Sequence, residues 1–145
     1  MKRIIVGSRA FFSGTYGFKS KDHDYLELVE NPTTFKWRRE QSLRGVCTFQ
    51  FKKEPVAQMV QRTLDSGEAL LVGKFLVPEV TQAIGATVAD ILPLEPLLSK
   101  LDDRHQYVAV IFEAVKQNGS FELTDEQRAA AYEVYRQARK SEIQR

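Results

Sequence analysis

The sequence predicts an α/β fold of the α+β type, in which a small mixed β-sheet core is followed by a C-terminal helical region. Short apolar or alternating runs dominate the first part of the chain, as expected for strands. Apolar stripes at helical spacing dominate the last part. We therefore expect residues 1–66 to form the sheet-containing core and residues 67–145 to form a mainly helical region that packs on it.

Each expected strand has its own local pattern. The strands are predicted at residues 3–6, 22–30, 33–39 and 45–52. The first is a β-branched apolar run that stops at a glycine, and the second ends at Asn31-Pro32 because proline restricts the residue before it. The last two alternate like the arms of a hairpin whose turn lies near 40–42. A short helix at 9–12 and a glycine-containing loop separate the first two strands, and together these segments predict a mixed sheet.

The helical part is predicted from apolar residues at helical spacing and from residues that commonly begin or end a helix. Pro55 suits the first position of a helix that stops near Ser66-Gly67. Residues 70–77 are strongly apolar and do not distinguish a strand from a helix, and residues 81–101 are broken into short helical pieces by one glycine and two prolines. A further helix is closed by Asn118-Gly119. The last begins with a capping box that runs from Thr124 to Gln127.

Composition sets limits on function. With 145 residues, 43% of them hydrophobic, the chain suits one compact folded protein. A net charge of +2 and a pI near 8.7 are too mild for a protein that coats nucleic acid, but they are compatible with a polyanionic ligand. The single cysteine, Cys47, predicts a packed thiol in a reducing cytoplasm. Without a signal-peptide core or a long apolar span, we expect a cytoplasmic protein that does not enter the membrane.

The segment from the first strand to the second carries the candidate chemistry. Gly7 and Ser8 follow the first strand, where a tight turn leaves backbone N–H groups to hold phosphate oxygens. Asp22 and Asp24 are two residues apart, so on one strand both carboxylates would share a face and a divalent cation. Oxygen ligands of this kind favour Mg²⁺ or Mn²⁺ over zinc.

The same residues resemble the nucleotidyltransferase superfamily related to polymerase β. Its signature is an apolar residue, Gly, then Gly or Ser, a spacer of about nine to thirteen residues, and two acids that flank one apolar residue. Here Val6-Gly7-Ser8 matches the opening, the spacer is 9–21, and Asp22-His23-Asp24 supplies the acids, with His23 in an apolar slot. The amino-acid sequence of this segment is most similar to those of the small predicted nucleotidyltransferases common in phage and bacterial genomes.

The resemblance implies a reaction and a set of site residues. The reaction is transfer of a nucleoside monophosphate from an NTP to an acceptor hydroxyl on a nucleic acid, a protein or a small molecule, with pyrophosphate leaving and magnesium required. Asp22 and Asp24 would be the catalytic, metal-binding residues. The nucleotide-binding set would comprise Gly7, Ser8, Arg9, Lys19 and Lys21.

The third acid of the superfamily is missing from its expected place. Gln50 holds the position where Asp or Glu is expected, and an amide does not accept a proton. Glu40 or Glu54 would supply the carboxylate only in another hairpin register, and a surface role suits both better. The alternative is a catalytically inactive module of the same fold that binds a nucleotide or a partner, such as an interaction protein of a phage or toxin–antitoxin type.

Other residues have two interpretations. The cations Arg9, Lys19 and Lys21 either neutralise phosphates or belong to a solvated loop. The run 36–39 interleaves a tryptophan with bases, which suits base stacking or a charged hairpin edge that resists aggregation. His23 is expected to be a packed strand residue, and His105 to lie at a helix start rather than in a metal site.

Overall fold

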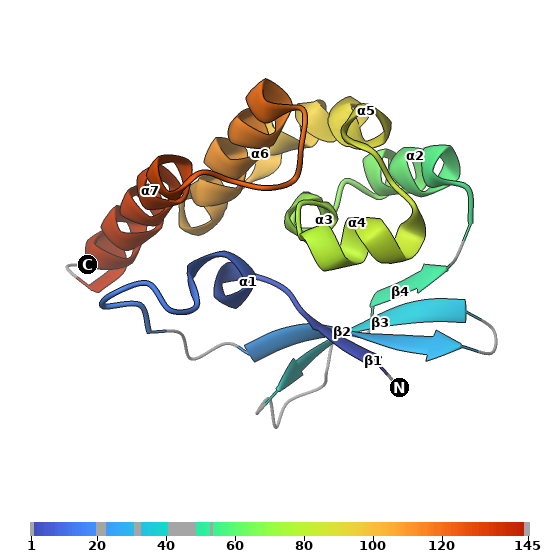
Figure 1. Cartoon of the computed structure of the whole chain (residues 1–145), viewed down its shortest axis with the longest axis horizontal. Coiled ribbons are helices and arrows are strands. Elements are labelled where there is room, and N and C mark those ends of the chain that lie inside the picture. The colour runs from blue at the N-terminus through green and yellow to red at the C-terminus, as the bar shows by residue number, and fades with distance from the viewer. Residues whose placement is uncertain (1, 20–22, 31–32, 41–48, 53, 144–145) are drawn as a thin grey trace. The chain divides into compact units, whose positions relative to one another are not determined.

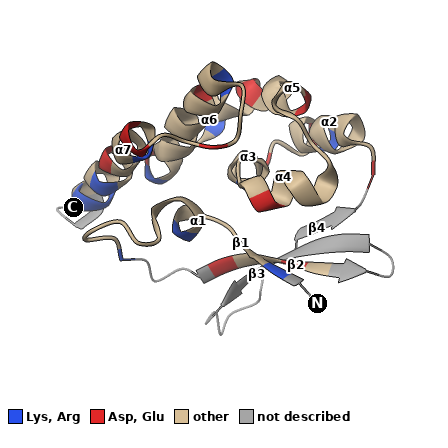
Figure 2. Ribbon diagram, viewed as in Figure 1, with Lys and Arg blue, Asp and Glu red and all other residues tan. Residues whose placement is uncertain are grey.

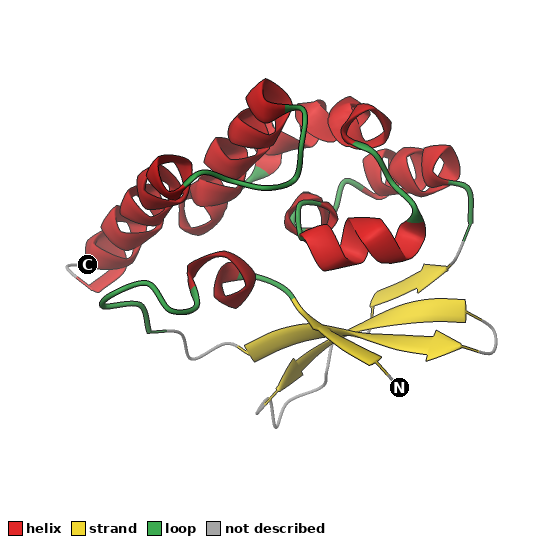
Figure 3. Ribbon diagram, in the orientation of Figure 1, coloured by secondary structure: helices red, strands yellow, loops and turns green. Residues whose placement is uncertain are grey.

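The computed structural model describes residues 2–19, 23–30, 33–40, 49–52 and 54–143 (Figure 1). A strand-rich part precedes a helical part, so the α+β fold class is confirmed (Figure 3). The chain divides into two compact units, Met1–Met59 and Val60–Arg145. Their boundary lies inside helix α2, Val56–Ser66, a few residues before the position expected from the sequence.

The first unit contains a four-stranded sheet in the order β1-β2-β3-β4 (Figure 1). The strands are β1 (Lys2–Ile5), β2 (His23–Glu30), β3 (Thr33–Glu40) and β4 (Phe49–Lys52). Every described pair is antiparallel, so the prediction of a mixed sheet is wrong. A parallel pair needs a crossover to the far end of the sheet, whereas β2 lies beside β1 and runs in the opposite direction.

The two faces of this sheet differ in polarity. Ile4 lies opposite Leu26, and both are fully buried. Since paired residues share a face, the same row continues through Trp37 and Phe49. The row of Arg3 and Glu27 belongs to the other face and continues through polar residues. The sheet therefore has one apolar face and one polar face, as expected when only one side packs on a core.

A short helix and a loop follow β1. Helix α1, Ser8–Phe12, buries Phe11 and Phe12. The chain then turns back, so that the ring of Phe18 lies 5.9 Å from that of Phe12, centroid to centroid. The Thr15 N–H donates to Phe12 O at 2.9 Å, and the Phe18 N–H donates to Thr15 O at 3.0 Å. The loop is thus anchored on the helix it follows, while Tyr16 is 99% exposed.

The second unit is helical. Its remaining helices are α3 (Leu71–Phe75), α4 (Pro78–Ile84), α5 (Val88–Ile91), the 3₁₀ helices η1 (Leu92–Lys100) and η2 (Asp103–His105), α6 (Gln106–Asn118) and α7 (Asp125–Ile143). Its core includes Phe75, Leu94, Ile111, Phe112 and Ala131, each at most 1% exposed. Among the described residues, no helix combines the length and the apolar character needed to cross a bilayer.

Several predicted helix ends are confirmed. Gly119 closes α6 in the left-handed conformation, with φ 63°. The Gln127 N–H donates to Thr124 Oγ1 at 3.1 Å, and the Thr124 N–H donates to Gln127 Oε1 at 3.0 Å, which is the expected capping box. Residues 70–77, ambiguous in the sequence, form helix α3 and its flanks.

Candidate functional site

The turn after β1 has a conformation that depends on glycine. Gly7 has φ 76° and ψ −161°, a region that residues with a side chain essentially do not occupy. Immediately after it, the Ala10 N–H donates to Gly7 O at 3.0 Å and helix α1 begins. The turn is therefore held between a strand on one side and a helix on the other.

Asp24 lies against this turn. A Cβ atom added to Gly7 would be 3.4 Å from Asp24 Oδ2. The Val6 N–H donates to Asp24 O at 3.1 Å, which extends the β1–β2 ladder up to the turn. Asp24 is 8% exposed and shares the apolar face with Leu26. The structure thus brings the glycine-serine turn and one aspartate of the motif into contact.

The other predicted site residues are distributed along the same segment. Ser8 and Arg9 are the first two residues of α1 and are half-buried. Lys19, at the end of the anchored loop, is exposed. The structure does not place Lys21 or Asp22, which lie outside the described residues, as does Cys47.

The expectation for Gln50 is wrong. Gln50 lies opposite Lys36, which lies opposite Glu27, so this row belongs to the polar face. Asp24 belongs to the apolar face, because successive strand residues alternate between faces. The positions of β3 and β4 that share the face of Asp24 are Thr33, Phe35, Trp37, Arg39, Phe49 and Phe51.

The two alternative carboxylates have different positions. Glu40 lies opposite His23 and therefore also belongs to the polar face. Glu54 follows β4 outside the paired strands and is half-buried. Among the paired positions described in β3 and β4, none places a carboxylate on the face of Asp24.

The polar face carries a cluster that the sequence analysis missed. The Arg3 guanidinium lies 4.7 Å from the centre of the Tyr25 ring, and Arg3 Nε lies 4.0 Å from Glu27 Oε2. Figure 2 marks the basic and acidic positions along the ribbon. The side chain of Arg3 is 61% exposed, whereas that of Glu27 is 7% exposed. The signal was available, because Arg3, Tyr25 and Glu27 occupy positions of their strands that alternate with Ile4, Asp24 and Leu26.

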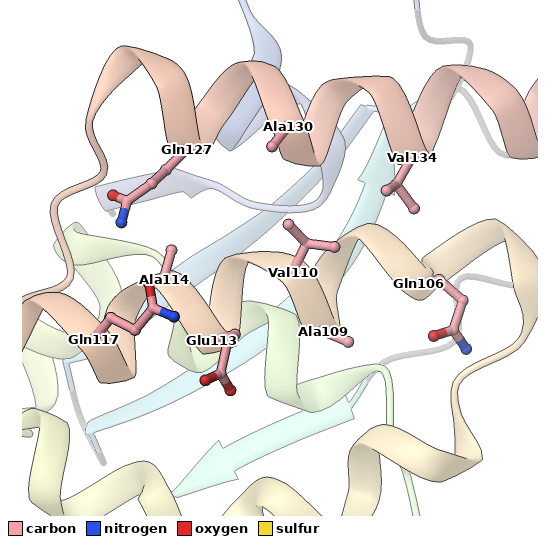
Figure 4. A pocket seen from close by; sticks show the side chains of 9 residues that line it. All are labelled: Gln106, Ala109, Val110, Glu113, Ala114, Gln117, Gln127, Ala130 and Val134. Carbon is pink, nitrogen blue, oxygen red and sulfur yellow. The ribbon is translucent and has the colours of Figure 1, made fainter.

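The second unit has a separate groove of about 630 Å³ between α6 and α7 (Figure 4). Its apolar part consists of Ala109, Val110, Ala114, Ala130 and Val134. Gln127 lies at one end and also bonds Asn118 through both amide atoms, at 2.7 and 2.9 Å. Glu113 is the only titratable residue in the lining, so the groove lacks the groups for acid–base chemistry.

His105 forms a local pair near the start of α6. Its Nδ1 lies 2.6 Å from Asp102 Oδ1. Partial burial raises the pKa of Asp102, but the hydrogen bond and charge of His105 outweigh it and hold that pKa below its usual value. This confirms the expectation that His105 belongs to a helix start.

Within the described part of the chain, no group of three or more His, Cys, Asp or Glu side chains is arranged to hold a metal ion. The metal pair predicted from the sequence includes Asp22, which that part does not contain. Comparison with known proteins finds no matching family model, no similar curated protein and no similar solved structure.

Proposed function

We propose that the chain is a nucleotidyltransferase-like protein whose first unit binds an NTP with a divalent cation at the turn after β1. One observation carries the proposal: the Asp24 carboxylate lies against Gly7, where the backbone conformation excludes a side chain. A carboxylate beside a turn with no side chain leaves room for a cation and a phosphate together.

The chemistry assigns a role to each residue. Asp24, with Asp22, supplies the oxygen ligands, and Ser8, Arg9 and Lys19 contact or neutralise the phosphates. A cation bound there would offset charge on the triphosphate. The acceptor hydroxyl oxygen forms a bond to the α-phosphorus, the bond from that phosphorus to the bridging oxygen breaks, and pyrophosphate leaves. The hydroxyl proton passes to a base, for which Glu54 is the described carboxylate nearest in sequence to β4.

Nucleotide binding is the first test. Affinity for a non-hydrolysable NTP is measured by calorimetry with Mg²⁺ and with EDTA, for the natural chain and for Asp24→Asn. Removing a metal ligand is expected to weaken the Mg²⁺-dependent affinity by at least about tenfold. Asparagine has the shape of aspartate, so the unfolding midpoint shows whether the variant remains folded.

Asp103→Asn is the matched control, because it removes the same charge from an exposed position in the second unit. It should leave the affinity unchanged. If both variants bind the nucleotide equally well, or if EDTA has no effect on the natural chain, the proposal is wrong.

A second candidate is a binding module of the same fold that performs no transfer. The register favours it, since the β4 positions on the face of Asp24 are Phe49 and Phe51, and neither accepts a proton. NTPs labelled at the α-phosphate, incubated with Mg²⁺ and a range of hydroxyl acceptors, separate the two candidates. Label on an acceptor, lost in Asp24→Asn, supports the transferase, whereas Mg²⁺-dependent binding without any transfer supports the module.

A further inference from the structure

The groove between α6 and α7 is shallow and elongated. Its lining on α6 runs from Gln106 to Gln117, which at 1.5 Å per residue is about 16 Å, or three helical turns. Of its five apolar residues only Ala114 is buried, whereas Ala130 is exposed and Val134 is half-buried. A small-molecule pocket encloses most of the surface of its ligand. An open channel of this length suits a segment of polypeptide better than a small molecule.

The apolar residues of the groove are small, three alanines and two valines. Figure 4 shows Val110 and Ala114 of α6 on one side and Ala130 and Val134 of α7 on the other. Helices pack with their axes about 8–10 Å apart, at a distance set by the side chains at the contact. Small residues on both walls therefore let a third helix lie close to α6 and α7. A helix in a groove is held by its apolar residues at positions i, i+3, i+4 and i+7.

The polar groups of the lining leave one carboxylate for a ligand. The Gln106 amide donates to the Leu101 carbonyl oxygen at 2.8 Å, and the Gln127 amide bonds to Asn118, so both amides already have partners in the fold. Glu113 is exposed and lies in the middle of α6, where it neither caps the helix nor stabilises its dipole. Its charge therefore has no evident role in forming α6.

The rim of the groove is acidic. Three or four positions from a lining residue, the two helices carry Lys116, Glu126 and Glu133. Lys116 Nζ lies 3.3 Å from a carboxylate oxygen of η1, and the Glu133 carboxylate accepts a hydrogen bond from an arginine of α7 at 2.9 Å. These charges are thus neutralised in pairs. Glu113 and Glu126, both exposed and one on each helix, remain as the excess charge beside the apolar floor.

This charge distinguishes between the possible occupants. Two copies of the chain that met groove to groove would bring two acids from each copy to one interface, where like charges repel. Two concave surfaces would also leave a space between them. A nucleic acid would be repelled as well, because its phosphates carry the same sign of charge.

We propose that the groove binds a basic amphipathic helix of a partner protein. The apolar face of that helix lies on the alanines and valines of the groove, and its Lys or Arg residues pair with Glu113 and Glu126. This interaction belongs to the second unit and does not depend on nucleotide binding by the first.

The test is selection from a phage-displayed library of helical peptides of about 18 residues, five turns, panned against the full chain. Ala130→Trp places a large side chain in the groove from an exposed position. Ala129→Trp is the matched control, because Ala129 is exposed on the same helix but does not line the groove. We expect peptides that bind the natural chain and Ala129→Trp at least about tenfold more tightly than Ala130→Trp. They should carry an apolar stripe flanked by Lys or Arg, and thermal unfolding shows whether both variants are folded.

A selected peptide then tests the acids by fluorescence anisotropy. Glu113→Gln with Glu126→Gln should weaken binding about tenfold at low salt, about threefold for each exposed charge pair, and much less at high salt. Glu79→Gln removes an exposed acid of α4 outside the groove and should have no effect. Asp24→Asn should also bind the peptide like the natural chain, which separates this interaction from the proposed NTP site.

Three results would overturn the proposal. The first is that no selected peptide distinguishes Ala130→Trp from Ala129→Trp. The second is that the peptides that do so are acidic or uncharged. The third is that sedimentation shows a dimer of the chain that Ala130→Trp dissociates and Ala129→Trp does not, because the occupant would then be a second copy.

Discussion

Gly7 determines how the candidate site is built. Its backbone, with φ 76° and ψ −161°, lies outside the left-handed helical region that asparagine or aspartate tolerate. The space where a side chain would begin lies 3.4 Å from Asp24 Oδ2, an ordinary contact distance. Strain in the backbone, rather than lack of room, therefore makes glycine necessary here.

Gly7→Ala should lower the free energy of unfolding of the first unit by about 3 kcal/mol, the upper end for a residue forced into such a conformation. The single tryptophan, Trp37, lies in β3, so its fluorescence during urea unfolding reports on that unit. Gly85→Ala is the control, because Gly85 is left-handed with φ 70° and ψ 28° and has open space around it. Gly85 lies in the second unit, so the unfolding of this variant is followed by far-UV circular dichroism. Gly85→Ala should lower the free energy of unfolding by about 1 kcal/mol. Equal costs would mean that the turn is not strained.

Individual residues also show which parts of the candidate site the sequence predicted correctly and which it did not. The motif predicted that Gly7 and Asp24 lie close together. This was possible because two strands joined by a short segment usually pair, which brings the end of the first beside the start of the second. The position of Gln50 was misjudged by one step of alternation, which moves a residue to the other face. Leu26 and Phe49 mark the apolar face in their own strands, so the alternation already separated Gln50 from Asp24.

The type and limits of a helix could be predicted from the sequence where only one of its faces is buried. The last two helices have an exposed face, so their apolar stripes indicate both type and limits. In contrast, every residue from 71 to 77 is buried, and a segment buried on all sides has no period to detect. Gly73 in this helix has Val108 of α6 3.5 Å from where its Cβ would lie, so its packing is tertiary and not visible in the local sequence.

Thr124→Ala tests the capping box of α7. The alanine removes the acceptor for the Gln127 N–H, and loss of such a cap costs about 1 kcal/mol of unfolding free energy. The measurement is urea unfolding followed by far-UV circular dichroism. Thr124→Ser keeps the hydroxyl and should retain most of the stability. If serine and alanine are equally destabilising, the hydrogen bond is not the source of the effect.

The capping box formed by Thr87 and Asp90 at the start of α5 makes the stability of the fold depend on pH. The Thr87 N–H donates to Asp90 Oδ2 at 2.7 Å, and together with the Thr87 hydroxyl it holds the pKa of Asp90 below its usual value. A carboxylate with a lowered folded-state pKa stabilises the fold above its unfolded pKa of about 3.9, and this contribution is lost as the pH falls through the folded pKa. The stability difference between the natural chain and Asp90→Asn should therefore be constant above about pH 5 and shrink below about pH 4. A difference that does not change between pH 7 and pH 3 would contradict this.

At the scale of the whole molecule, the two units differ in how much buried apolar surface stabilises them. The second unit contains most of the large buried side chains, and its helices α6 and α7 pack on each other. The first is a four-stranded sheet with one short helix, close to the size at which a domain buries too little surface to be stable alone. The strand-like runs followed by helical stripes predicted the α+β class, but a boundary inside α2 could not be predicted, because the apolar stripe of that helix is continuous.

This difference predicts separate behaviour for the second unit. A fragment of residues 55–145, which keeps α2 whole, should show a helical circular dichroism spectrum and a single cooperative thermal transition, because its helices contact one another. Phe112→Ala should lower the stability of that fragment by about 3–5 kcal/mol, since Phe112 is 1% exposed and its removal leaves a cavity. Val134→Ala, on the open groove, should cost much less. A fragment that melts without cooperativity, or that is insensitive to Phe112→Ala, would show that the helical core depends on the sheet.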